Sequence, residues 1–220
     1  GVINRVLVGK VGGKVVDDVG LRLKCPFQLL LIQNIAMDLM GQELMVSYYT
    51  SPEEVEELLD KITRLSIEVG RRFKVLSYDV SGGVTAVVRQ TCPQVYLTSN
   101  CSVEMISNDL YEKFLLKYDQ MLADEFVHFG VHHCGKSMEH VVDGYSKLKG
   151  LEFAEVGAFS DMKAVRKKLP GVFLNARYSP VRLMRASESE IMEEVQELVR
   201  NGQENGGQIS VSCVGIDRNV

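Results

Sequence analysis

The sequence lacks an excess of charge of either sign. Lys and Arg number 25 against 29 Asp and Glu, which gives a formal net charge of −4 and a pI of about 5.7. Proteins that bind nucleic acid or anionic membranes through charge carry a basic patch. The one basic cluster lies toward the end of a predicted helix, where cations complement the helix dipole, so we interpret it as a solvated face. It comprises Lys163, Arg166, Lys167 and Lys168. We therefore expect neither nucleic acid nor a membrane as a partner.

The sequence also lacks a long apolar run and a disulfide framework. The most apolar stretch, 27–40, is interrupted by Gln33, Asn34 and Asp38 and is too short to cross a bilayer. No signal-peptide pattern opens the chain. The five cysteines are an odd number without paired spacing, and a chain of this size does not need disulfides to fold. These absences predict a soluble protein in a reducing cytoplasm.

Repeats, low-complexity tracts and interdomain linkers are missing as well, so we expect one domain over residues 1–220. The hydrophobic share of 45% is enough to build a full core. Residues 1–25 alternate apolar and polar around a Gly-Gly pair and predict a hairpin-like segment. The run 27–35 is compatible with a buried strand, although a buried helix fits the same pattern.

Strand and helix patterns alternate through the rest of the chain, which predicts an α/β fold with a parallel sheet. Ser51, Pro52 and Glu54 form a strong start signal for a helix over 51–73. Ser187 and Glu190 form a capping box before another helix. The remaining predicted strands are 74–80, 95–99, 126–131, 151–156, 172–175 and 209–213, and the remaining predicted helices are 108–122, 136–148 and 161–168.

The stretch FVHFGVHHCGKSMEH, 126–140, holds the most informative side chains. Alternate residues of a strand point to the same face, so His132 and Cys134 share one face and His133 takes the other. Gly135 then permits a tight turn. This strand end therefore presents an imidazole and a thiol together, which are two zinc ligands.

A catalytic zinc site usually has three protein ligands. Cys213 is the best-placed third ligand, because it closes the apolar strand of Ile209 and Val211 before a Gly-containing turn. The alternative is that Cys134 and Cys213 are small buried hydrophobic residues and His132 is a hydrogen-bonded core residue. Residue spacing alone leaves both interpretations open.

The HHCG motif after a strand, the preceding helix YEKFLLKYDQML and the late strand ending in Cys resemble the uroporphyrinogen decarboxylase superfamily. Within it, the sequence is similar to the corrinoid-dependent methyltransferase branch, most clearly from about Tyr96 onward. The resemblance implies a TIM-type (β/α) barrel and zinc ligation by His132, Cys134 and Cys213. Because a complete barrel needs about 250 residues, and the chain starts at Gly1 rather than Met, we expect the barrel to be incomplete at its N-terminus.

Three further polar residues lie at predicted strand ends. Glu155 is a candidate catalytic residue, as a fourth ligand or a base, with a surface carboxylate as the alternative. Asn100 and Asn175 are candidate substrate-binding residues. An acidic residue often occupies the position of Asn100 in the resembled family, so an acid/base role does not carry over, and a plain turn residue is the alternative.

The resemblance predicts a zinc-dependent methyltransferase that moves a methyl group between a small substrate and a corrinoid cofactor. The substrate would be a thiol, or a methoxylated or methylamine-type compound. The corrinoid would be free or carried by a partner protein. Two alternatives remain: a metal-free decarboxylase like uroporphyrinogen decarboxylase, and a non-catalytic corrinoid-binding module. The metal content of the purified protein distinguishes the zinc enzyme from the metal-free decarboxylase. Turnover with free methylcobalamin distinguishes it from the non-catalytic module.

Overall fold

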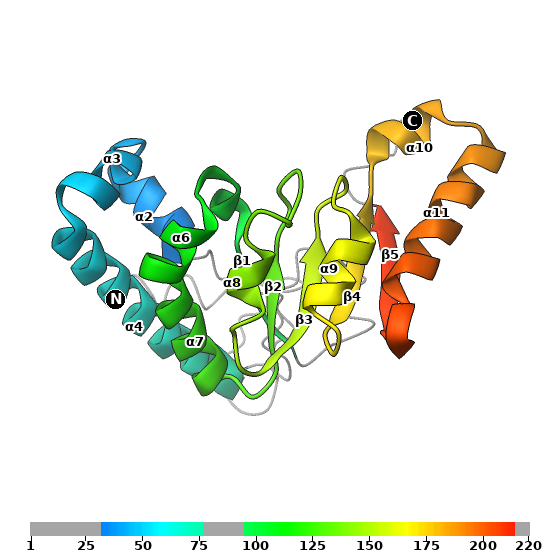
Figure 1. Cartoon of the computed structure of the whole chain (residues 1–220). Coiled ribbons are helices and arrows are strands. Elements are labelled where there is room, and N and C mark those ends of the chain that lie inside the picture. Colours follow the sequence, from blue (N-terminus) through cyan, green and yellow to red (C-terminus); the bar gives the residue numbers. More distant parts are fainter. Residues whose placement is uncertain (1–31, 77–94, 214–220) are drawn as a thin grey trace, which may run out of the picture.

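A computed structural model describes residues 32–76 and 95–213 of the chain (Figure 1). The first part is helical, with α2 (Ile32–Met40), α3 (Glu43–Thr50) and α4 (Pro52–Leu76). The second part begins with β1 (Tyr96–Ser99), η1 (Cys101–Met105), α6 (Asn108–Leu110), η2 (Tyr111–Leu115), α7 (Leu116–Glu125) and β2 (Phe129–His132). It continues with α8 (Val142–Tyr145), β3 (Leu151–Val156), α9 (Met162–Lys168) and β4 (Phe173–Tyr178). It ends with α10 (Pro180–Arg185), α11 (Glu188–Gly202), η3 (Glu204–Gly206) and β5 (Ile209–Cys213). The hairpin predicted over residues 1–25 lies outside the described residues.

The five strands form one parallel sheet in the order β1-β2-β3-β4-β5 (Figure 1). Each crossover passes through helical segments, as parallel neighbours require. Sequential order with every strand parallel is the arrangement of successive strands in a TIM-type barrel. The predicted α/β fold with parallel strands is therefore confirmed.

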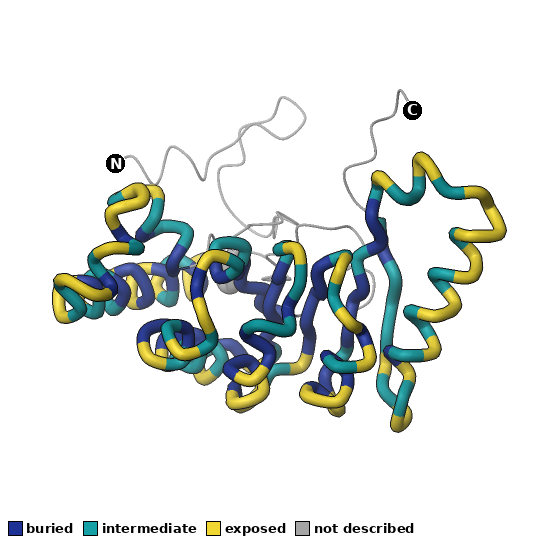
Figure 2. The backbone as a smooth tube through the Cα atoms, turned by 45° about the horizontal axis from the view of Figure 1, so that its top comes forward, coloured by how far each residue is buried: buried dark blue, intermediate teal, exposed yellow. Residues whose placement is uncertain are grey.

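The main core lies between one face of the sheet and the helices. Strand residues Phe129, Val131, Ala154 and Leu174 are fully buried in it. Figure 2 shows the buried positions following the strands, with exposed positions on the outer turns of the helices. The opposite face has a smaller apolar cluster of Val95, Leu97 and Phe153, with Phe173 packed against it. At this level of the sheet the strands are thus apolar on both faces, as buried parallel strands are.

Local sequence signals explain most element boundaries. The capping box of Ser187 and Glu190 is present at the start of α11. Asp161, one residue later than predicted, caps α9 by accepting from the N–H groups of Lys163 and Ala164. Prediction and structure agree for the strand Leu151–Val156.

Residues 32–35 are helical, which decides the open choice over 27–35, and the buried Ile32 and Ala36 follow i,i+4 spacing. Two expectations differ from the structure. Residues 74–76 continue α4 rather than beginning the strand predicted over 74–80, whose other residues lie outside the described ranges. The helix expected over 136–148 is limited to Val142–Tyr145. Hydrogen bonds from Phe159 N to the Lys136 carbonyl and from Met138 N to Ser160 Oγ hold the preceding residues in a loop.

The interpretation of the basic cluster as a solvated face is wrong for one member. Arg166 is 1% exposed, and its guanidinium donates to the carbonyl groups of Leu169, Val172, Gly202 and Gln208. This side chain ties α9 to the segment that leads into β5. None of the helices in the described residues is both long and apolar enough to pass through a membrane.

Candidate metal centre

Polar side chains gather on the inner face of the sheet, which we define as the face opposite the main core. Strand register places Ser99, His132, Glu155 and Asn175 in one row across β1 to β4. The row beneath it is formed by Leu97, Gly130, Phe153 and Phe173. Because side chains alternate along a strand, both rows face the same way. The polar row therefore stands on an apolar floor at the carboxyl ends of the strands.

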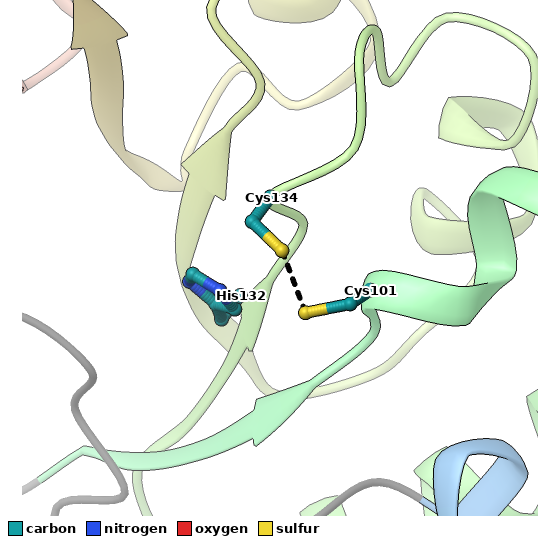
Figure 3. Close-up of side chains that lie close together, drawn as sticks. All are labelled: Cys101, His132 and Cys134. Carbon is teal, nitrogen blue, oxygen red and sulfur yellow. Dashed lines mark hydrogen bonds between the residues drawn. The ribbon is translucent and has the colours of Figure 1, made fainter. Parts of the chain in front are cut away.

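Three potential metal ligands meet at this edge: Cys101, His132 and Cys134. Their ligand atoms all lie within 4.8 Å of one another, and the two sulfurs are 2.6 Å apart. Figure 3 shows Cys101 at the start of η1, His132 at the end of β2 and Cys134 in the loop that follows. Zinc binds sulfur at about 2.3 Å and imidazole nitrogen at about 2.0–2.1 Å, so ligands of one ion lie within about 4.6 Å of each other. The donor set fits zinc, and the three ligand atoms can converge on one ion once the two sulfurs separate from 2.6 Å to the roughly 3.7 Å of a tetrahedral site.

Glu155 orients the imidazole of this cluster. The carboxylate is fully buried, and its Oε2 forms a short hydrogen bond with His132 Nδ1. That bond fixes the ring and leaves Nε2 as the nitrogen available to a metal, which is how carboxylates support zinc-binding histidines. The other oxygen, Oε1, has no hydrogen-bond partner among the described residues and lies 3.6 Å from Arg177 Nε.

The cluster has the electrostatics of a thiolate and imidazolium pair. The hydrogen bond with Cys134 holds the pKa of Cys101 well below its usual range, against the opposing effect of burial, and a hydrogen bond with His132 lowers it further. Burial alone would lower the pKa of His132, but hydrogen bonds and charges of Cys101 and Glu155 raise it to about 9. The hydrogen bond with Cys101 and burial raise the pKa of Cys134. Thiolate is the form that binds metals.

Cys213 lies at the same end of the sheet as His132 but is not part of this cluster. It pairs with Tyr178 at the end of β5 and follows Ile209 and Val211, which pack against the main core. Strand alternation therefore places Cys213 on the helix side of the sheet. The structure brings together two of the three predicted ligands and adds Cys101 to them; ligation by Cys213 stays a prediction.

The two predicted substrate-binding residues are fully buried. Asn100 donates from Nδ2 to Asp119 Oδ2 at 3.0 Å, and Tyr111 donates to the same oxygen at 2.8 Å. Burial raises the pKa of Asp119 to about 6, although these two hydrogen bonds oppose the rise. Asn175 is bonded to side chains of β5. Substrate binding by Asn100 and Asn175 remains a prediction.

Sequence reasoning missed Cys101 and Arg177. Each lies two positions after an inner-face residue and therefore faces the same way: Cys101 follows Ser99, and Arg177 follows Asn175. The rule that pairs His132 with Cys134 would have found both residues. Cys101 lies just beyond the end of β1, in η1, as Cys134 lies just beyond the end of β2.

Comparisons with known proteins agree with this architecture. The family model described as uroporphyrinogen decarboxylase matches residues 34–216. A solved structure, a methyltransferase from Methanosarcina mazei, is similar with a TM-score of 0.63 and 18% sequence identity. The similarity covers 84% of this chain and 51% of that one, so the chain spans about half the length of this structural relative. A comparison with curated proteins gives no match. With more than half of its length matched by the family model, the chain belongs to the uroporphyrinogen decarboxylase family.

Proposed function

We propose that this chain is a zinc-dependent methyltransferase of the uroporphyrinogen decarboxylase family, acting between a small substrate and a corrinoid. The observation that carries the proposal is the cluster of Cys101, His132 and Cys134, whose ligand atoms lie within 4.8 Å of one another beside a buried carboxylate. Sulfur and imidazole donors together suit zinc and do not suit magnesium or calcium. When bound, zinc would hold a substrate thiol as thiolate or polarise the leaving heteroatom of a methyl donor.

Each residue of the site has a role that follows from its contacts. His132 would bind through Nε2, while its Nδ1–H donates a hydrogen bond to Glu155 that fixes the ring. Two thiolates would supply negative charge that keeps a bound substrate sulfur reactive. The apolar row of Leu97, Phe153 and Phe173 lies beneath the polar row. It keeps water from approaching the metal ligands through the sheet.

Cys101 and Cys213 are competing candidates for the second thiolate. The structure favours Cys101, since its sulfur is 2.6 Å from that of Cys134. Cys213 is the residue that the family resemblance implies, and it ends the strand two places beyond β3. We propose Cys101 as the ligand and keep Cys213 as the alternative.

The corrinoid and the small substrate are proposals that rest on the family resemblance. Arg177, on the same face of the sheet one row beyond Asn175, brings a guanidinium to within 3.6 Å of Glu155 beside the cluster. A guanidinium there would suit an anionic or strongly polar group of the substrate. A small methyl donor or acceptor would approach the thiolates from the carboxyl ends of the strands.

The test measures bound zinc and methyl transfer on the same preparation of the chain. We expect stoichiometric zinc, and zinc-dependent methyl transfer from methylcobalamin to a small thiol, followed by the change in corrinoid absorbance. Cys134→Ser should abolish zinc binding and methyl transfer. Ser210→Ala, on β5 and outside the cluster, should preserve both activities. A chain that binds no zinc would support a metal-free decarboxylase. Zinc without turnover, for either free methylcobalamin or a corrinoid protein, would support a non-catalytic module.

A further inference from the structure

A second group of metal-ligating side chains lies beside the first, on the other side of the β2 strand end. His133 follows His132 and points away from the inner face, as strand alternation predicts. One ligand atom each from Glu104, His133 and His140 lies within 4.8 Å of the other two. The group uses different residues from the thiolate cluster, although both draw on η1 and on the loop after β2.

We propose that Glu104, His133 and His140 form a second site for a divalent transition-metal ion. Two imidazoles and one carboxylate are the ligands of several zinc sites with an open fourth position, and of non-haem iron sites. The site does not depend on the function proposed above, because it includes none of the thiolate ligands.

The carboxylate of Glu104 is the first observation that points to a ligand. Its Oε2 is buried and has no hydrogen-bond partner among the described residues. It lies 3.6 Å from His133 Nε2, which is too long for a hydrogen bond. Two ligands of a tetrahedral zinc at about 2.0–2.1 Å are about 3.4 Å apart, which is close to this separation. Within the described ranges, Glu104 forms no ion pair with Lys or Arg.

Gly135 supplies the second observation. A Cβ atom at this position would lie 2.0 Å from Glu104 Oε2 and 3.0 Å from His133 Nε2. The space beside these two ligand atoms therefore depends on the absence of a side chain. A larger residue would fill the position from which an ion reaches both of them.

The hydrogen bonds of the two histidines show which nitrogen each would offer to a metal and what metal binding would displace. His133 is fully buried, with Nδ1 3.1 Å from the Tyr145 hydroxyl and Nε2 3.0 Å from the Ser137 carbonyl. The carbonyl can only accept, so without a metal Nε2 donates to Ser137 and Nδ1 accepts from Tyr145. Metal binding through Nε2 therefore requires the proton to move to Nδ1, which can then donate to the Tyr145 oxygen, while the Ser137 carbonyl is released. His140 Nε2 lies 3.2 Å from the Val103 carbonyl and donates to it, which leaves Nδ1 for the metal.

The test loads metal-stripped full-length chain with Zn²⁺ and, in parallel, with Co²⁺. We expect a second equivalent of zinc beyond that of the thiolate cluster. His140→Gln and Glu104→Gln should each lose that second equivalent, whereas the matched variant His128→Gln should keep it. His128 is an exposed histidine that pairs with Glu152 and belongs to neither group.

Cobalt distinguishes the two sites by their ligands. Thiolate-to-cobalt charge-transfer absorption reports the Cys101 cluster, so it should vanish in Cys134→Ser and persist in His140→Gln. Visible d–d absorption from a nitrogen and oxygen site should persist in Cys134→Ser. Failure of the thiolate site alone therefore removes only the charge-transfer band. The proposal is overturned if folded His140→Gln and Glu104→Gln, checked by circular dichroism, bind as much metal as the wild type. It is also overturned if cobalt-loaded Cys134→Ser, folded by the same check, shows no visible d–d absorption from a nitrogen and oxygen site.

Discussion

The carboxyl ends of β1 to β3 and those of β4 and β5 form one edge of the same sheet, yet they hold different kinds of groups. The first region holds two thiols, an imidazole and a buried carboxylate, which converge without forming a fully paired network. In the second region Asn175, Ser210 and Ser212 satisfy one another through hydrogen bonds. Polar residues at a strand end therefore do not mark a binding site by themselves. What distinguishes the first region is a set of converging metal ligands beside a buried carboxylate oxygen, Glu155 Oε1, that has no hydrogen-bond partner among the described residues.

The largest effect expected from this comparison is the loss of zinc when the first region is altered. Cys134→Ser or His132→Gln should reduce zinc affinity by more than about 100-fold, because removal of an outer-shell partner alone costs about 10–100-fold. Competition with a chromophoric chelator measures the affinity. Ser210→Ala, in the second region, is the control and should leave it unchanged. If folded Cys134→Ser still bound stoichiometric zinc, the first region would not be the zinc site.

A paired substitution decides which cysteine is the second thiolate. Cys101→Ser should weaken zinc binding by at least about 10-fold, whereas Cys213→Ser should change it little, because strand alternation directs the latter to the helix side. Zinc affinity and circular dichroism are measured on both variants. If only Cys213→Ser loses zinc while staying folded, the ligand set implied by the family resemblance is correct. Cys101 would then lie beside the metal without binding it.

These two cysteines also show how far sequence reasoning reached. The period of two along β2 was enough to place His132 with Cys134, and regular β-α alternation was enough to predict the parallel sheet. Cys213 was expected from its location at a strand end, but its face depends on the register of β5, which one sequence does not reveal. The same limit applies to Arg166, whose buried hydrogen bonds depend on carbonyl groups up to 42 residues away. Long-range pairing of this kind leaves no local pattern.

The pH dependence of zinc binding should reveal the His132 and Glu155 pair. Since hydrogen bonds and charges from Cys101 and Glu155 overcome burial and raise the pKa of His132 to about 9, binding below that pH must displace a proton from the imidazole. Apparent affinity should therefore rise with pH and rise less steeply above about 9. Glu155→Gln removes one of the groups that raise this pKa, so the change of slope should move to lower pH. Chelator competition between pH 6 and 10 measures both curves, and an unchanged break in Glu155→Gln would exclude the carboxylate from this role.

The smallest expected effect is on stability, and it concerns Asn175 in the second region. Its Nδ2 donates to Ser212 Oγ at 3.0 Å and its Oδ1 accepts from Ser210 Oγ at 2.9 Å, so the side chain joins β4 to β5. Asn175→Ala would leave these hydroxyls without their partner and should cost about 1–3 kcal/mol of unfolding free energy. In a chain of this size each kcal/mol lowers Tm by about 2–4 °C. Thermal unfolding measures this loss, and Ser210→Ala, which removes only the more exposed bond, should cost less. Zinc affinity should not change in either variant. If Asn175→Ala keeps its Tm but raises KM for the methyl substrate, the residue binds substrate, as its place at a strand end predicted.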